Sequence, residues 1–139
     1  MINLGIESYI IAATTQAILA QRLVRLICRE CIDERPLNQH ESAWLSKLPY
    51  KTEGVAFKYG KGCSYCNNTG YRGRMAIFEL LEFNDEMAEA LRSNNTASFH
   101  ELAKKSEHHQ LLADDAYRLV VEGKTSITEM IRVINEGYA

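Results

Sequence analysis

The sequence has little of what marks an exported, membrane-spanning or nucleic-acid-coating protein. Its 139 residues include only two prolines, and the formal net charge of -2 provides no global basic field for nucleic acid or an anionic membrane. The longest apolar stretch, residues 9–27, is interrupted by threonine, glutamine and arginine and is too polar to span a bilayer. No basic start precedes an apolar block with a small-residue cleavage site, so we expect no signal peptide. Together these absences favour a globular protein of the cytosol, where thiols stay reduced.

Signatures of enzymatic catalysis are also missing. The chain contains neither G-x-S-x-G nor H-E-x-x-H, and its acidic pairs, Asp33-Glu34 and Asp114-Asp115, are adjacent residues that would not face a common substrate. His108 and His109 are adjacent too, and we interpret them as exposed or partly packed side chains. We therefore predict no catalytic residues in this chain.

Gly123-Lys124-Thr125 resembles the end of a phosphate-binding loop. That loop requires G-x-x-x-x-G-K-[ST] between a buried strand and a helix, but Arg118 occupies the first glycine position and the residues before Gly123 follow a helical pattern. A helix that ends at Gly123 and restarts after a cap at Ser126 accounts for the segment. The prediction is a turn between helices and no nucleotide-binding residues.

Hydrophobic periodicity predicts a mainly helical α+β protein. Apolar residues recur at three- and four-residue steps over 6–27, which predicts one N-terminal helix. A second, short helix is expected over 38–48, where Asn38 and Glu41 have capping-box spacing. Alternating residues within 54–62 and over 74–82 predict two strands, which we expect to form a β-hairpin across the glycine-rich turn between them.

From Asn84 onward the pattern predicts a cluster of four helices. Asn84 is the expected N-cap of the first helix, and capping-box spacing marks the second and the fourth. These two boxes are Ser98 with Glu101 and Ser126 with Glu129. The last helix is expected to end at Gly137. The whole chain therefore reads as an N-terminal helix, a small cysteine-bearing α/β insert and a helical C-terminal cluster.

The four cysteines form two C-x2-C pairs, Cys28 with Cys31 and Cys63 with Cys66. Two such pairs supply the four thiolates of a tetrahedral zinc site, and the nearby glycines allow tight turns whose N–H groups support the sulfurs. The 31 residues between the pairs exceed the usual spacing, but lengthening the loop costs only about 0.5 kcal/mol. Structural zinc contributes about 10–16 kcal/mol in small peptides, so we predict zinc bound by all four cysteines.

Other interpretations of the cysteines remain open at this point. Two disulfides or a redox-active pair would also use C-x2-C, although the βαβ context of a thioredoxin-like site is absent. A catalytic zinc would keep an open position and usually recruit histidine or carboxylate. Several basic residues near the cysteines could offset the charge of four thiolates: Arg29, Lys58, Lys61, Arg72 and Arg74.

Three segments together resemble the C-terminal portion of the secretion ATPase family, which includes the type II secretion ATPase and the assembly ATPases of type IV and MSHA-type pili. The segments are "GIESYIIAATTQAILAQRLVRLICREC", "FKYGKGCSYCNNTGYRGRMAIFELLEFNDEM" and "LADDAYRLVVEGKTSITEMIRV". The combination of two widely spaced C-x2-C pairs with T-G-Y-R-G-R and I-F-E-L-L is specific, and the resemblance covers nearly the whole chain.

The resemblance implies that the chain is part of a larger hexameric enzyme. Residues 1–27 would be the last helix of a RecA-like ATPase core, 28–83 a zinc-binding subdomain and 84–139 a helical subdomain. ATP and magnesium would bind upstream, so this chain alone is expected to be inactive. The family works from the cytoplasm at the inner membrane, which implies neighbouring ATPase subunits and membrane-platform proteins as partners. Whether that larger enzyme serves secretion or pilus assembly stays open.

Two further hypotheses concern the surface around the cysteines. Arg72 and Arg74 are candidate contacts for a partner protein, although they could equally be solvated residues that balance the thiolates. A stand-alone zinc-ribbon module that binds nucleic acid or protein is the alternative function, because Tyr65 and Tyr71 accompany these arginines. The net charge of -2 counts against nucleic acid. A peptide-binding, chaperone-like cysteine module is a weaker alternative.

Overall fold

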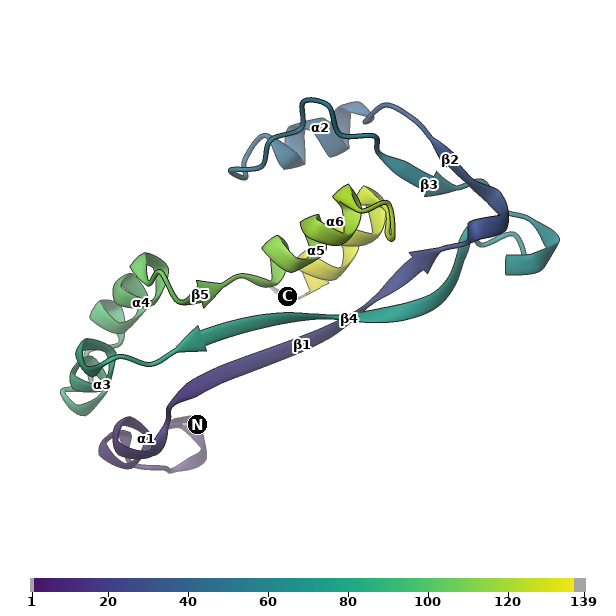
Figure 1. Cartoon of the computed structure of the whole chain (residues 1–139). Coiled ribbons are helices and arrows are strands. Elements are labelled where there is room, and N and C mark those ends of the chain that lie inside the picture. The colour runs from purple at the N-terminus through teal and green to yellow at the C-terminus, as the bar shows by residue number, and fades with distance from the viewer. Residues whose placement is uncertain (1, 137–139) are drawn as a thin grey trace. The chain divides into compact units, whose positions relative to one another are not determined.

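The computed structural model describes residues 2–136, and these residues contain six α-helices and five strands. The expected class, α+β with more helix than strand, is confirmed. β1 (Ala17–Ile27), β4 (Tyr71–Glu82) and β5 (His109–Gln110) form a three-stranded sheet in the order β1-β4-β5. Figure 1 shows β1 and β4 as the two long strands of this sheet. The chain divides into two compact units, and both long strands continue from one unit into the other.

The N-terminal helix is much shorter than the sequence pattern suggests. After a 3₁₀ turn (Ile2–Leu4), α1 covers only Ser8–Thr14, and residues 17–27 form strand β1. The prediction of one helix over 6–27 was therefore wrong for its second half. Pairing with β4 outweighs the helical spacing of the apolar residues, because strand or helix preference is a weak local bias that tertiary contacts override.

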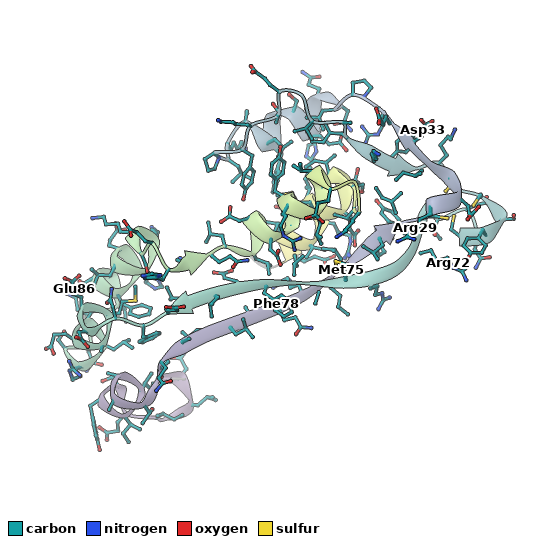
Figure 2. All side chains as sticks on the ribbon, viewed as in Figure 1. Arg29, Asp33, Arg72, Met75, Phe78 and Glu86 are labelled. Atoms are coloured by element: carbon teal, nitrogen blue, oxygen red, sulfur yellow. The ribbon has the colours of Figure 1, made fainter. Side chains whose placement is uncertain are left out.

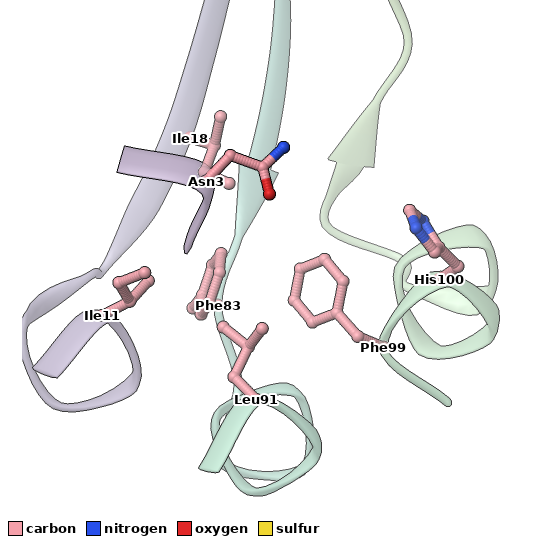
Figure 3. Close-up of a pocket in the computed structure, with 7 residues that line it drawn as sticks. All are labelled: Asn3, Ile11, Ile18, Phe83, Leu91, Phe99 and His100. Carbon is pink, nitrogen blue, oxygen red and sulfur yellow. The ribbon is translucent and has the colours of Figure 1, made fainter. Parts of the chain in front are cut away.

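The first unit comprises residues 1–20 and 78–111. In it, α1 packs on α3 (Asp85–Arg92), and α3 packs on α4 (Thr96–Lys105). β5 pairs antiparallel with the end of β4, with Leu80 opposite Gln110. This unit contains an open, mainly apolar cavity of about 500 Å³. Ile11, Phe83, Leu91 and Phe99 are among its lining residues (Figure 3).

The second unit comprises residues 21–77 and 112–139 and contains the largest hydrophobic core. α5 (Leu112–Val121) and α6 (Ile127–Glu136) pack together, and α2 (Gln39–Leu45) packs on α6. The core combines side chains from these helices with strand residues and includes Val24, Leu45, Ile77, Leu119, Val120 and Met130, each 1% exposed or less. Burial of this apolar surface is the main driving force that holds the unit together.

A second sheet in this unit differs from the expected hairpin. β3 (Lys58–Gly60) lies within the expected strand, but it pairs antiparallel with β2 (Ile32–Glu34), with Ile32 opposite Gly60. The expected strand 74–82 is present as part of β4, which pairs with β1 and β5 instead. The predicted hairpin between the two strands was therefore wrong, because each strand has a partner that lies outside the expected pair.

Two of the predicted helix N-caps are confirmed, and each uses a side chain close in sequence to the helix. Asn38 and Glu41 form a complete capping box at α2, and Asn84 caps α3 by accepting from the Met87 N–H. At α4 the cap is Asn95, which accepts from the Ser98 N–H, so the expected box at Ser98 was wrong. The four helices expected after Asn84 are all present, and the expected end at Gly137 lies outside the described residues.

Among the described residues, no helix combines the length and apolarity that crossing a membrane requires.

Candidate metal centre

The four cysteines meet where strands of the second unit end. Cys28 directly follows β1, and Cys31 ends a 3₁₀ turn (Arg29–Cys31). Cys63 directly precedes a second 3₁₀ turn (Ser64–Cys66), and Cys66 ends it. In Figure 2 their sulfur atoms appear as a yellow group beside the labelled Arg72. All four Sγ atoms lie within 4.8 Å of one another.

The distances between the sulfur atoms match a tetrahedral metal site. Cys28 to Cys63 and Cys31 to Cys66 are 3.9 Å apart, and Cys63 to Cys66 is 3.8 Å. A zinc ion at the centre, with bonds of about 2.3 Å, would set each edge of the tetrahedron near 3.8 Å. A disulfide needs sulfurs about 2.05 Å apart, and all four cysteines are free. The cysteines are therefore close enough to bind a metal ion, and their geometry favours that interpretation over disulfides.

Backbone N–H groups point at the sulfurs from the turns. Gly62 N–H donates to Cys31 Sγ, and the N–H groups of Cys63 and Gly70 donate to Cys66 Sγ, each at 3.3 Å. Such donors stabilise negative charge on sulfur and orient the ligand. The donor set thus fits thiolates, which is the form that binds a metal.

Close backbone contact joins the two halves of the site. Cys28 N–H donates to the Gly70 carbonyl, and Lys61 N–H donates to the Cys31 carbonyl, both at 2.9 Å. Gly60 and Gly70 approach so closely that a Cβ added at either would overlap the backbone of the other. Only glycine allows two chain segments to lie this near, so both glycines help to bring the two cysteine pairs together.

Cys31 and Cys66 differ strongly in acidity. Burial raises the pKa of Cys31 to about 12, although the Gly62 N–H opposes the shift. Burial acts in the same direction on Cys66, but the N–H donors of Cys63 and Gly70 outweigh it and lower the pKa of Cys66 to about 6. Cys66 is therefore the more easily ionised of these two thiols, and metal binding would displace the proton of Cys31.

Two of the basic residues near the cysteines, Lys61 and Arg72, have partners of their own. Lys61 Nζ forms an ion pair with Asp33 at 3.0 Å. Arg72 donates to the Tyr65 carbonyl at 2.6 Å and stacks over the Tyr65 ring at 3.9 Å from its centroid. Arg74, two residues further along β4, lines a separate cavity. A contact between Arg72 or Arg74 and a partner protein stays a prediction.

The tyrosines that suggested nucleic-acid binding are already engaged. The face of Tyr65 holds Arg72, and the face of Tyr71 holds Arg25 at 4.2 Å from the ring centroid. The Tyr71 hydroxyl also hydrogen-bonds with Ser126. Stacked bases need free aromatic faces, so this arrangement offers the nucleic-acid alternative no support.

Gly123-Lys124-Thr125 forms the turn between α5 and α6, as expected. Gly123 has φ of +70°, and Lys124 N–H donates to the Leu119 carbonyl at 2.9 Å, which closes the end of α5. Thr125 is fully buried and donates its hydroxyl to the Arg25 carbonyl at 2.7 Å. The hydroxyl that would hold magnesium in a phosphate loop therefore anchors this turn to β1.

No histidine or carboxylate of the described residues joins the four cysteines in the candidate metal centre. His109 is partly buried in the first unit, where its ring nitrogens lie 3.0 Å from the Ala103 carbonyl and 2.9 Å from Glu79. Over the described residues, the cysteine cluster is the one group of three or more His, Cys, Asp and Glu side chains with metal-binding geometry.

A second polar cluster was not anticipated from the sequence. Glu129 was expected to complete a capping box with Ser126. One half of that box is present, because the Glu129 N–H donates to Ser126 Oγ at 3.1 Å. Its carboxylate, however, is fully buried and binds the guanidinium groups of Arg25 and Arg132 at 2.7 and 2.6 Å. The three-residue spacing of Glu129 and Arg132 could have suggested one of these pairs; nothing local points to Arg25.

The sequence matches known proteins along most of its length. The sequence model of the family described as "Type II/IV secretion system protein" matches residues 1–132. The chain is 32% identical to the type II secretion system protein E of Pseudomonas aeruginosa over 137 residues, which are 98% of this chain. It is 35% identical to the type IV pilus assembly ATPase PilB of Myxococcus xanthus over 94% of the chain, and 32% identical to PilB of Thermus thermophilus over 93%.

These relatives are much longer than the chain. The matched region is 26% of the Pseudomonas protein, 23% of the Myxococcus protein and 14% of the Thermus protein. The chain thus spans about a quarter or less of the curated relatives it matches.

Proposed function

The chain belongs to the type II/IV secretion system protein family, and we propose that it serves as the zinc-binding structural and interaction region of an ATPase that powers type II secretion or pilus assembly. The observation that carries this proposal is the four-cysteine cluster, whose sulfurs lie within 4.8 Å of one another. The names of the relatives, a type II secretion protein E and pilus assembly ATPases, support the assignment of the machine.

Zinc is the metal that the donor set fits best. Four sulfur ligands in a tetrahedron are typical of structural zinc, and a site closed by four protein ligands leaves no open position for a substrate. Cys28 and Cys31 would hold the ion from one side, and Cys63 and Cys66 from the other. Bound zinc would supply a rigid cross-link between segments that are 35 residues apart in the chain.

ATP hydrolysis belongs, in this proposal, to other parts of the assembled machine. Residues 1–27 would adjoin a RecA-like ATPase core, 28–83 would be the zinc subdomain and 84–139 the helical subdomain. The assembled enzyme would be a hexamer at the cytoplasmic face of the inner membrane, with neighbouring subunits and platform proteins as its partners. Arg72 and Arg74, both exposed on β4, are the residues proposed to contact such a partner.

A hybrid enzyme tests the proposal. The matching segment of the Pseudomonas aeruginosa type II secretion system protein E is replaced by this chain, and both ATP hydrolysis and secretion are measured in a strain that lacks the native protein. We expect the hybrid to hydrolyse ATP and to restore secretion, and the Cys63→Ser hybrid to lose both activities. Ser64→Ala, in the same turn, is the control. A hybrid that binds zinc and assembles but neither hydrolyses ATP nor restores secretion would contradict the proposal.

A further inference from the structure

A cavity of about 430 Å³ in the second unit is lined by three arginines. Arg25 from β1, Arg74 from β4 and Arg132 from α6 surround it, and Leu23 supplies an apolar wall. This volume is within the range of small-molecule sites. The cavity belongs neither to the cysteine cluster nor to the turn at Gly123.

Two of the arginines are held rigidly by Glu129. Arg25 donates to Glu129 Oε2 through Nε at 3.0 Å and Nη2 at 2.7 Å. Arg132 donates through Nε to Oε2 at 2.9 Å and through Nη2 to Oε1 at 2.6 Å. Tyr71 lies against the Arg25 guanidinium and restricts it further. Guanidinium groups positioned in advance lose little side-chain entropy when a ligand binds.

Glu129 stays ionised near neutral pH, so its hydrogen bonds to Arg25 and Arg132 persist there. Burial disfavours its charged form, but the hydrogen bonds from Arg132 and Arg25 outweigh burial and lower the pKa of Glu129 to about 2. The same contacts raise the pKa of Arg132. The carboxylate and both guanidinium groups therefore stay charged over the physiological range.

The cavity retains positive charge after its ion pairs are counted. Arg132 also pairs with Glu136, at 2.8 Å, so Arg25, Arg74 and Arg132 face two carboxylates and one positive charge is in excess. Arg74 supplies the excess, because no carboxylate of the described residues lies within ion-pair distance of it. An exposed arginine beside two immobilised ones is an arrangement that suits a compact anion with more than one charge.

The geometry points to a binding site for a phosphoryl group at Arg25, Arg74 and Arg132, with a small phosphate-bearing molecule as its ligand. Arginine forks match phosphate oxygens in bidentate fashion. The phosphate group of such a ligand contacts Arg74 and the outward edge of Arg25, while Arg132, whose guanidinium nitrogens donate to Glu129 and Glu136, contributes positive charge. Leu23, which is 49% exposed, contacts any apolar part of the same ligand.

Calorimetric titration of the metal-loaded chain at low salt tests the site. The probes are pyrophosphate and magnesium-free ADP, which separate recognition of phosphate alone from recognition of a nucleotide. We expect both to bind, and Arg74→Gln to weaken binding by about tenfold or more. Arg72→Gln is the matched control, because Arg72 lies outside the cavity on Tyr65, and it should change the affinity by less than about twofold. Amide chemical-shift changes should centre on Leu23, Arg25 and Arg132.

The other possible results of the titration either overturn the proposed site or identify which ligand it prefers. Tighter binding of ADP than of pyrophosphate supports the site and assigns the nucleotide contact to Leu23, which Leu23→Ala then weakens. Absence of binding for both probes at low salt overturns the proposal. Equal weakening by Arg72→Gln and Arg74→Gln also overturns it, because surface charge in general would then account for binding. Binding of a glutamate-rich peptide without binding of either phosphate probe overturns it in favour of a protein partner.

Discussion

The cysteine cluster and the Arg25–Glu129–Arg132 cluster both connect distant segments of the second unit, but through different chemical groups. Each joins distant parts of the second unit: Cys28 and Cys63 are 35 residues apart, whereas Arg25 and Glu129 are 104 apart. The cysteine cluster is built on tight turns, and we propose that a zinc ion completes it. The ion-pair cluster is complete without a ligand, because one buried carboxylate receives hydrogen bonds from two arginines and from the Arg25 N–H. The comparison shows that the ion-pair cluster links this unit through side-chain hydrogen bonds of its own, whereas the cysteine cluster brings four sulfurs close enough to bind a metal ion.

The largest effect is expected from breaking the cysteine cluster. Cys63→Ser removes one of four ligands, and structural zinc contributes about 10–16 kcal/mol of apparent binding free energy in small peptides. We expect one zinc per wild-type chain by elemental analysis, and loss of both the metal and cooperative unfolding in the variant. Ser64→Ala should keep its zinc. Wild-type protein that contains no metal, or a Cys63→Ser variant that retains one zinc per chain, would refute this prediction.

Breaking the ion-pair cluster should cost less, because no metal is lost. Glu129→Gln leaves two arginines without their carboxylate, and breaking a buried ion pair costs about 3–5 kcal/mol. Both arginine side chains are 41% exposed, so we expect a loss near the lower limit, about 3 kcal/mol, by urea denaturation. Glu122→Gln, which removes an ion pair at a more exposed carboxylate, should cost less than about 1 kcal/mol. Equal effects of the two substitutions would show that burial of Glu129 adds nothing.

Acid should weaken the ion-pair cluster in a defined pH window. In the folded state, burial is outweighed by hydrogen bonds from Arg132 and Arg25, which lower the pKa of Glu129 from its ordinary value of 4.5 to about 2. A lowered pKa contributes stability that is fully present above the unfolded-state value and is lost as the pH falls through the folded-state value. The difference in unfolding free energy between wild type and Glu129→Gln should therefore shrink between about pH 5 and pH 2. A difference that stays constant across this window would contradict the assignment.

The smallest effect is expected at the turn that precedes Glu129. Gly123 has φ of +70°, and a Cβ there would lie 2.9 Å from Lys58 Cδ, which a flexible side chain can relieve. We expect Gly123→Ala to cost about 1 kcal/mol in thermal or urea unfolding, mainly from backbone strain. Gly54→Ala has a similar φ of +73° and open space around the added Cβ, so the difference between the two variants isolates the Lys58 contact. A larger loss at Gly54 than at Gly123 would contradict this view.

Several features of the fold were predictable because they depend on neighbouring residues. The capping box of Asn38 and Glu41, the cap at Asn84 and the turn at Gly123 all use contacts within a few residues. The C-x2-C spacing likewise indicated which four side chains would meet, because two residues between cysteines place both sulfurs on one side of a turn.

Other features depended on distant partners and were missed. Residues 17–27 have helical spacing but form β1, because β4 is available to pair with them. The same reason explains why β3 pairs with β2 rather than with β4.

The sequence by itself determined the caps at Asn38 and Asn84, the mainly helical α+β class and which four cysteines cluster, since the caps and the C-x2-C pairs follow from short-range spacing. Only the tertiary structure decided that β1 is a strand and that Glu129 binds Arg25 and Arg132 rather than its own helix terminus. The physical reason is that a side chain such as Glu129 has both a local and a distant choice of partner. A buried carboxylate is stabilised more by two cations than by one backbone N–H, and only the folded chain brings those cations within reach.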